Sequence, residues 1–404
     1  MEPVPASELA QRMERLQRLL VQEGIDLALL RQLTDLFYYT GIVAEGFLAV
    51  PATGQPRFLL RRPRERPTLG EMPWEVTCYS DLKELPGLVG DLAPETATIG
   101  LELDVLPAAL YLRLKEQLFP RARFRDLSLL VRRQRMVKSN YEVEQIRRAA
   151  ARLDEAFAQV PQLIRPGMTE LELAAALEYR LRLLEHQGMV RVRRWDMEMF
   201  FGHVLSGESG LVAAYVDTPS GGVGFSAAFP QGASKKPLRE GEPISIDLAA
   251  CFHGYVADMT RLYAIRELPD PAWRALDLIL RLFRIFEAEA RAGVQPGELY
   301  RRLLEEVQQE GLEEYFMGRG ADRVSFLGHG VGLELDELPI IAARFPFPLE
   351  ADMVLAFEPK LFLPGIGMIG LEDTGRITSQ GVEWLTQTPR RVKEWSGLPK
   401  LPGG

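Results

Sequence analysis

Two aspartates stand inside otherwise apolar, strand-like sequence, and they restrict what this chain can fold into more than any other feature. Residues 242–265 read EPISIDLAACFHGYVADMTRLYAI, which predicts two strands joined by a turn at Gly254. Asp247 falls in the first strand and Asp258 in the second. Because strand interiors disfavour aspartate and an unpaired buried carboxylate is costly, a cation must accompany these acids. That cation is either a metal ion or a basic side chain such as Arg261.

A second pair of acids repeats this pattern nearer the C-terminus. Glu358 ends the apolar stretch MVLAF, and Glu372 follows the apolar stretch GMIGL. A salt bridge at the end of a sheet would explain either glutamate by itself, whereas four acids of this kind in one region favour a common site. Between the two pairs, the segment FLGHGVGLELDELPII places His329 between two glycines, which let backbone and substrate come close.

Four carboxylates and one imidazole suit a particular kind of metal centre. The set carries too much negative charge for a single tetrahedral zinc site built from soft ligands. Its oxygen-rich composition favours two divalent ions bridged by carboxylates, drawn from Mn²⁺, Co²⁺, Zn²⁺ and Fe²⁺. Two such ions about 3.5–4 Å apart can share and deprotonate a water and polarise a carbonyl. The sequence therefore predicts a dinuclear hydrolytic centre.

The organisation of the chain predicts two domains, because 404 residues are too many for one ordinary core. Residues 1–133 alternate helical and strand-like patterns and predict an α/β domain without a chemistry-bearing cluster. Ser139 followed by Glu142 is a capping-box signal for the helix that opens the second domain, residues 134–404. Within that domain, PGMTELELAAALEYRL and AGVQPGELYRRLLEEV predict two αα-plus-sheet halves related by an approximate two-fold. The alternative is that two amphipathic helices merely look alike.

Composition and charge argue against several classes of function. The net charge is −8 and basic residues are spread along the chain, which disfavours nucleic acid as a partner. No apolar run approaches the ~20 residues that a membrane span needs. The N-terminus lacks the basic region and cleavage site of a signal peptide, and two cysteines, Cys78 and Cys251, do not make a disulfide framework. We therefore expect a cytoplasmic protein.

The ordered set of four acids and one histidine resembles the pita-bread metallopeptidase family. That family includes methionine aminopeptidase, aminopeptidase P, prolidase and the metal-independent relative creatinase. The stretches HGYVADMTR, GHGVGLELDELP and VKSNYEVEQIRRAA are similar to its local signatures. The resemblance implies an α/β creatinase/prolidase-like N-terminal domain over residues 1–133. It also implies an α+β pita-bread (creatinase/aminopeptidase) catalytic domain over residues 134–404 with an internal pseudo-two-fold, and a homodimer.

The resemblance also implies a role for each matching residue. Asp247 would bind one metal and Asp258 would bridge both. His329 and Glu358 would bind the second metal, and Glu372 would bridge. Glu358 would additionally carry a proton from the attacking water to the leaving amine.

Two substrate-side histidines that are usual in the family are absent from this sequence. One position is taken by Asp336, and the other lies in the window FPQG, residues 229–232. An ionised aspartate cannot donate a hydrogen bond to a developing oxyanion, and losing such a donor typically costs about 10²–10³ in rate. Asp336 would have to be protonated or pair with a substrate amine or an arginine, unless it is only a loop residue. His203, on a strand-like segment, either replaces a missing imidazole or is a packed or surface histidine.

The leading hypothesis is a metal-dependent peptidase that hydrolyses short peptides, with Xaa-Pro bonds as the expected substrates. Attack would come from a water that bridges the two metals. One alternative is a hydrolase of a non-standard dipeptide or non-peptide amide on the same metal site. The other is a pita-bread binding protein with little catalysis, against which the complete ligand set argues.

Overall fold

The chain folds into two units of different architecture, Met1–Arg135 and Met136–Gly404. The computed structural model describes residues 3–65, 72–216 and 218–395. The division lies close to the predicted boundary between residues 133 and 134. Among the described residues, no helix has the length and apolar character that crossing a membrane requires.

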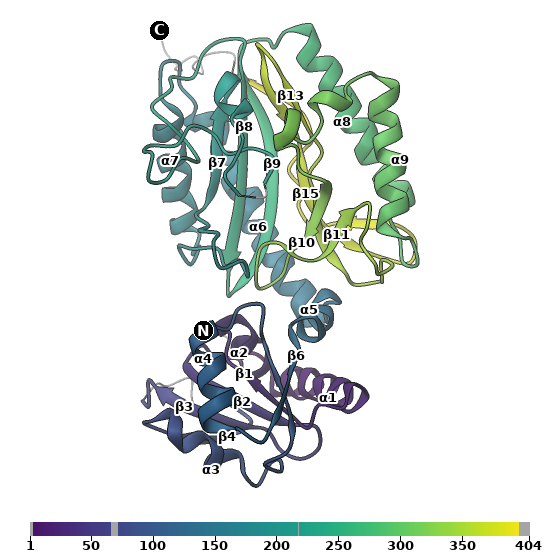
Figure 1. Ribbon diagram of the computed structural model, residues 1–404. Coiled ribbons are helices and arrows are strands. Elements are labelled where there is room, and N and C mark those ends of the chain that lie inside the picture. The colour runs from purple at the N-terminus through teal and green to yellow at the C-terminus, as the bar shows by residue number, and fades with distance from the viewer. Residues whose placement is uncertain (1–2, 66–71, 217, 396–404) are drawn as a thin grey trace. The chain divides into compact units, whose positions relative to one another are not determined.

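The N-terminal unit is built on a six-stranded mixed sheet in the order β4-β3-β2-β1-β5-β6 (Figure 1). Its strands are β1 (Leu27–Leu30), β2 (Glu45–Pro51), β3 (Arg57–Arg62), β4 (Glu75–Cys78), β5 (Thr98–Leu101) and β6 (Arg123–Asp126). Its helical segments are α1 (Ala6–Glu23), α2 (Leu33–Thr40), η2 (Leu82–Glu84), α3 (Leu85–Val89), α4 (Ala108–Leu112), the π-helix η3 (Arg113–Leu118) and α5 (Ser128–Met136). The strands β2 and β3 form an antiparallel hairpin.

The C-terminal unit contains a nine-stranded sheet in which seven strands follow the order β11-β10-β12-β15-β9-β8-β7. These strands are β7 (Gly202–Ser206), β8 (Pro243–Phe252), β9 (Tyr255–Ile265), β10 (Phe326–Gly330), β11 (Glu337–Ala342), β12 (Val354–Phe357) and β15 (Glu372–Ile377). The strands β16 (Val382–Trp384) and β17 (Lys393–Trp395) pair with β15 and β9, while β13 (Lys360–Leu363) and β14 (Gly367–Gly370) form a separate hairpin. The helical segments are α6 (Asn140–Leu163), α7 (Glu170–Leu183), η4 (Gly207–Leu211), α8 (Asp270–Glu289), α9 (Pro296–Gln309), η5 (Glu313–Tyr315) and η6 (Gly320–Asp322).

The sheet of this unit is made of two similar halves, as the repeated helix pattern predicts. In the first half, α6 packs against β8 and β9, and α7 packs against α6 and β7 (Figure 1). In the second half, α8 packs against α9 and β14, and α9 packs against β11. The halves meet where β9 pairs with β15, so the acid-bearing strands of both lie at the centre of the sheet. The predicted capping box of Ser139 and Glu142 begins α6.

The hairpin of β8 and β9 turns the two aspartates toward one side of the sheet. Its turn residues His253 and Gly254 both have positive φ, 49° and 88°, which favours glycine at the second position. The register pairs Asp247 with Thr260 and Ala249 with Asp258. Since residues two apart in a strand point to the same face, both aspartates point to one face of the hairpin.

The side chain of Arg261 points to the face of the hairpin opposite to that of Asp247 and Asp258. It neutralises a different acid. Its guanidinium donates to Asp373 Oδ1 at 2.6 Å and to the carbonyl oxygen of Glu372 at 2.7 Å. The side chains of Arg261 and Asp373 are 2% and 1% exposed. The alternative in which Arg261 neutralises the aspartates of the hairpin is therefore wrong, because strand alternation sends it to the opposite face.

We expect the variant Asp373→Ala to lower the free energy of unfolding by about 3–5 kcal/mol, because it leaves the buried Arg261 without its counter-charge. Urea unfolding followed by tryptophan fluorescence would measure the loss. Glu240→Gln is the matched control, since Glu240 forms a comparable pair with Arg266 but both side chains are more than half exposed. Equal unfolding midpoints for the two variants would contradict this account of β9 and β15.

Candidate metal centre

A small hollow in the C-terminal unit contains the candidate site. Its volume is about 40 Å³, room for an ion and one or a few waters. Its lining includes all five predicted metal ligands and three further polar side chains that sequence analysis singled out: Asp247, Asp258, His329, Glu358, Glu372, His203, Gln231 and Asp336. These residues come from both halves of the sheet, so the fold brings together what the sequence separates by more than a hundred positions.

His329 Nε2 faces three of the carboxylates at distances suited to shared coordination. It lies 3.5 Å from Glu358 Oε1, 3.7 Å from Glu372 Oε1 and 3.9 Å from Asp258 Oδ2. Two atoms that each lie about 2.1 Å from a common tetrahedral ion are themselves about 3.4 Å apart. The side chains of His329, Asp258 and Glu372 each present a ligand atom within 4.8 Å of the other two.

Two buried carboxylate oxygens at this point have no hydrogen-bond partner among the described residues, Asp258 Oδ1 and Glu372 Oε1. Buried polar atoms are normally satisfied, so these two oxygens, of which Glu372 Oε1 lies 3.7 Å from His329 Nε2, suit a bound cation. Burial, together with the charges of Glu372 and Asp247, raises the pKa of Asp258 well above its usual range. Burial likewise raises the pKa of Glu372, although Lys360 opposes this. The donor set on the His329 side therefore fits one divalent ion.

The other ring nitrogen of His329, Nδ1, lies close to two hydrogen-bond acceptors. Nδ1 lies 3.4 Å from Asp336 Oδ1 and 3.3 Å from the carbonyl oxygen of Gly330. Two acceptors at Nδ1 favour a proton there, which leaves the Nε2 lone pair free for a metal. Burial alone would lower the pKa of His329, but Asp336, Glu358 and Asp258 outweigh it and raise the pKa. Asp336 thus lies in the site as an orienting partner of His329.

Lys360 is the residue at this site that the sequence prediction missed. Its Nζ lies 2.6 Å from Glu358 Oε2, 2.9 Å from Asp247 Oδ2 and 3.2 Å from Glu372 Oε2. Burial would lower the pKa of Lys360, but Asp247, Glu358 and Glu372 outweigh it and raise the pKa well above its usual range. Burial raises the pKa of Asp247, yet Lys360 and His203 more than offset this and lower it. The ammonium of Lys360 therefore neutralises part of the negative charge of this centre.

A sequence signal for Lys360 does exist. It stands two residues after Glu358 in FEPKLFL, an otherwise apolar stretch. Alternation in extended chain directs residues two apart to the same side, which places the lysine with the glutamate. A lysine in such a stretch is a basic side chain that could neutralise the buried acids in place of a metal ion, which is the alternative stated for the aspartate pair.

His203 stands beside Asp247 as its direct cross-strand partner in the pairing of β7 with β8. It is 8% exposed, and its Nδ1 has no hydrogen-bond partner within the described ranges. Burial lowers the pKa of His203, with Asp247 partly opposing, so the ring is neutral near neutral pH. In the window where a family histidine was expected, Gln231 lines the hollow. An imidazole and an amide are therefore present on the side where the usual histidines are missing.

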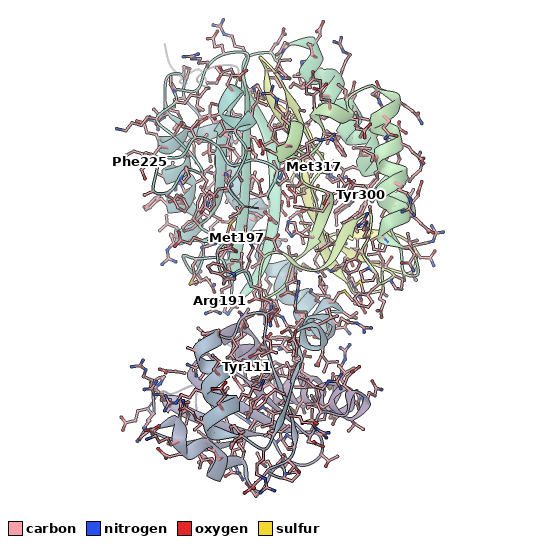
Figure 2. All side chains as sticks on the ribbon, viewed as in Figure 1. Tyr111, Arg191, Met197, Phe225, Tyr300 and Met317 are labelled. Atoms are coloured by element: carbon pink, nitrogen blue, oxygen red, sulfur yellow. The ribbon has the colours of Figure 1, made fainter. Side chains whose placement is uncertain are left out.

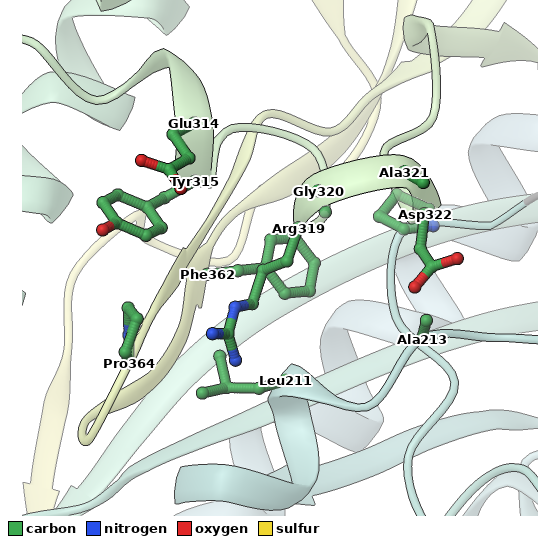
Figure 3. Close-up of a pocket in the computed structure, with 12 residues that line it drawn as sticks. Leu211, Ala213, Glu314, Tyr315, Arg319, Gly320, Ala321, Asp322, Phe362 and Pro364 are labelled. Carbon is green, nitrogen blue, oxygen red and sulfur yellow. The ribbon is translucent and has the colours of Figure 1, made fainter.

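A larger hollow of about 480 Å³ in the same unit is separate from this centre (Figure 3). It is lined by residues of η4, η5, η6 and the segment after β13, among them Leu211, Tyr315, Arg319, Asp322 and Phe362. No predicted metal ligand is among the described residues that line it. One of its lining residues, Phe362, belongs to the same strand as Lys360.

We expect the variant Asp336→Gly to weaken binding of Zn²⁺ or Co²⁺ about 10–100-fold, because outer partners of a metal-binding histidine typically contribute this much. Glycine suits the positive φ of 61° at this position, so the change removes the carboxylate without backbone strain. Asp336→Asn keeps an acceptor oxygen and should lose less. Competition with a chromophoric chelator would measure the affinities, with Asp277→Ala on the exposed face of α8 as control. An unchanged affinity in Asp336→Gly would show that Asp336 does not orient His329.

Comparison with known proteins gives the same picture over nearly the whole chain. Residues 12–137 match the creatinase/prolidase N-terminal domain. An Xaa-Pro dipeptidase of Pyrococcus furiosus is 25% identical over 389 residues, which cover 95% of this chain and 100% of that protein. The crystal structure of an X-Pro aminopeptidase from Thermotoga maritima superposes with a TM-score of 0.77 at 29% identity, covering 94% of this chain and 98% of that one.

The structure of an Xaa-Pro dipeptidase from Bacillus anthracis gives a TM-score of 0.80 at 27% identity, with 95% of this chain and 99% of that chain covered. These likenesses confirm the predicted fold, a creatinase-type N-terminal domain followed by a pita-bread domain. Residues 144–379, more than half of the chain, match the family described as metallopeptidase family M24. The protein belongs to metallopeptidase family M24.

Proposed function

We propose that this protein is a metal-dependent hydrolase of short peptides, with Xaa-Pro dipeptides as its first expected substrates. The observation that carries the proposal is the convergence of His329 Nε2 with oxygens of Asp258, Glu358 and Glu372 around one point. The relatives named as Xaa-Pro dipeptidases support the choice of substrate. A homodimer and a cytoplasmic location stay predictions from the sequence.

A bound divalent ion would supply Lewis acidity toward a peptide carbonyl and a water of lowered pKa. Around that ion we assign the ligand roles to Asp258, His329, Glu358 and Glu372, and Asp247 to the Lys360 side of the centre. Glu358 is the proton carrier, because one of its oxygens faces His329 and its side chain lines the hollow. It would accept the proton of the attacking water and deliver it to the departing amine.

The identity and number of ions are part of the proposal. One imidazole among carboxylates suits Mn²⁺, Co²⁺, Zn²⁺ or Fe²⁺ equally. A pair of ions is the expectation from the ligand set alone, and the ammonium of Lys360 weighs against the second of them.

The substrate would enter on the side of His203 and Gln231. Met197 and Val216 also line the hollow, and both belong to segments outside helices and strands (Figure 2 labels Met197). Because these segments lie outside helices and strands, we expect them to adjust when substrate binds.

A second candidate, a hydrolase of a non-standard dipeptide or a non-peptide amide, is favoured by one specific observation. Gln231 and Asp336 line the hollow where imidazoles are usual in the family. An amide and a carboxylate recognise different substrate groups from those recognised by two imidazoles. The same metal chemistry would then act on a different class of amide.

A panel of Xaa-Pro dipeptides, longer Xaa-Pro peptides and N-acyl amides, assayed with Mn²⁺, Co²⁺ or Zn²⁺, tests both candidates. We expect dipeptides to be cleaved and Glu358→Gln to lower kcat about 10²–10⁴-fold, because proton transfer of this kind contributes that much. Metal content measured in parallel separates loss of the ion from loss of proton transfer, and Glu350→Gln on an exposed loop is the control. Cleavage of amides but not dipeptides would favour the second candidate, and no cleavage at all would sink both.

We expect His203→Leu, which removes the donor, to lower kcat/KM about 10²-fold while metal content stays at the wild-type level, because the neutral imidazole donates a hydrogen bond to the substrate. His253→Asn is the control, since His253 is exposed in the turn of β8 and β9 and asparagine tolerates its positive φ. Equal kinetics for the two variants would show that His203 is a packing residue only.

A further inference from the structure

The ammonium of Lys360 contacts three of the predicted metal ligands at once. A centre that holds two metal ions would leave no role for this ammonium. The contacts of its Nζ with Glu358, Asp247 and Glu372 all lie between 2.6 and 3.2 Å. The side chain is 2% exposed. A divalent ion on this side of the centre would need the same three oxygens at about 2.0–2.2 Å. The ammonium and that ion cannot bind them together.

The surroundings of Lys360 are shaped for a lysine stem. Lys360 pairs with Gly370 across the hairpin of β13 and β14. A Cβ at Gly370 would lie 2.4 Å from Lys360 Cγ and 3.0 Å from its Cβ, so the space that any other residue would fill is taken by the stem. Met317, labelled in Figure 2, fixes the backbone, because its N–H donates to the carbonyl oxygen of Lys360 at 2.9 Å.

The two glutamates divide their oxygens between two cation positions. Oε2 of Glu358 and Oε2 of Glu372 contact Lys360, whereas Oε1 of each faces His329 Nε2. Thr260 also donates to Glu372 Oε2 at 2.8 Å and fixes this orientation. Each carboxylate therefore bridges as it would between two metals, with an ammonium at one of the two positions.

We propose that the Lys360 ammonium permanently replaces one of the two cations, and that the centre holds a single divalent ion, on the His329 side. The ligands of that ion are Asp258, His329, Glu358 and Glu372, and Asp247 serves the ammonium instead. This proposal rests on the proposed function in one respect: it takes the single ion to be the one that activates water for hydrolysis.

Displacement of the lysine by a second ion is disfavoured by the packing. A withdrawn ammonium would lose three carboxylates and stay inside the protein, since β13 and Gly370 enclose its stem. Breaking a buried charge pair in this way is strongly unfavourable.

Metal analysis of reconstituted and dialysed protein tests the proposal without any substrate. We expect about one Mn²⁺ per chain in the wild type, and about two in Lys360→Ala, which frees the three oxygens. Electron paramagnetic resonance of the Mn²⁺-loaded wild type should show an isolated ion, whereas Lys360→Ala should show a coupled pair. His329→Ala should remove the single ion of the wild type.

Lys138→Met is the matched control, because Lys138 is an equally buried lysine whose Nζ pairs with Glu337 at 3.1 Å, outside the ligand set. Its ion count should equal that of the wild type.

Two ions in the wild type, one ion in folded Lys360→Ala, or a retained ion in His329→Ala would each overturn the proposal. If Lys360→Ala does not fold, the wild-type count and spectrum together with His329→Ala still decide. Failure of the proposed function would instead appear as a correctly loaded wild type that cleaves no peptide or amide.

Discussion

Neutralising four carboxylates inside one sheet is the requirement on which the rest of this structure depends. Asp247, Asp258, Glu358 and Glu372 all line one small hollow. Asp258, Glu358 and Glu372 are more than nine-tenths buried, whereas Asp247 is less buried. Like charges at this density are tolerable only with cations among them. The chain supplies one cation itself, through Lys360, and leaves one oxygen each of Asp258 and Glu372 without a hydrogen-bond partner among the described residues.

The two halves of the sheet explain how such a cluster is held in place. Each half contributes two acids from its central strands, and the junction of β9 with β15 sets the distance between them. Arg261 and Asp373 lie across this junction as a separate buried pair, so the junction is stabilised independently of any metal. Because strand backbones carry the ligands, the geometry on the His329 side exists before an ion arrives, which limits the reorganisation that binding requires.

The sequence made part of this site predictable because certain residues are out of place in apolar strands. Asp247 and Asp258 could be found in that way, since only a cation explains them. Lys360 was missed because a lysine near a strand end usually extends its stem to solvent; its two-residue spacing from Glu358 hinted at an inward direction, and its position opposite Gly370 in the pairing of β13 with β14 agrees with that. The positions of His203 and Gln231 depend on the register of β7 with β8 and on a loop path, and neither can be read from local sequence.

An ammonium and a divalent metal ion both neutralise carboxylates, with one and two positive charges respectively, and they also differ in what they offer a substrate. The ammonium of Lys360 has three N–H donors, and its three carboxylate contacts use all of them. It cannot coordinate a carbonyl oxygen or activate a water, as an open metal position can. If the centre holds one ion, the charge that develops on the reacting carbonyl would have to be stabilised partly by neutral donors, and the lining of the hollow includes His203 and Gln231. Under the proposed single-ion centre, the ammonium of Lys360 and the unusual substrate-side residues would be parts of one adaptation, in which hydrogen bonds replace part of the charge stabilisation that a second ion would give.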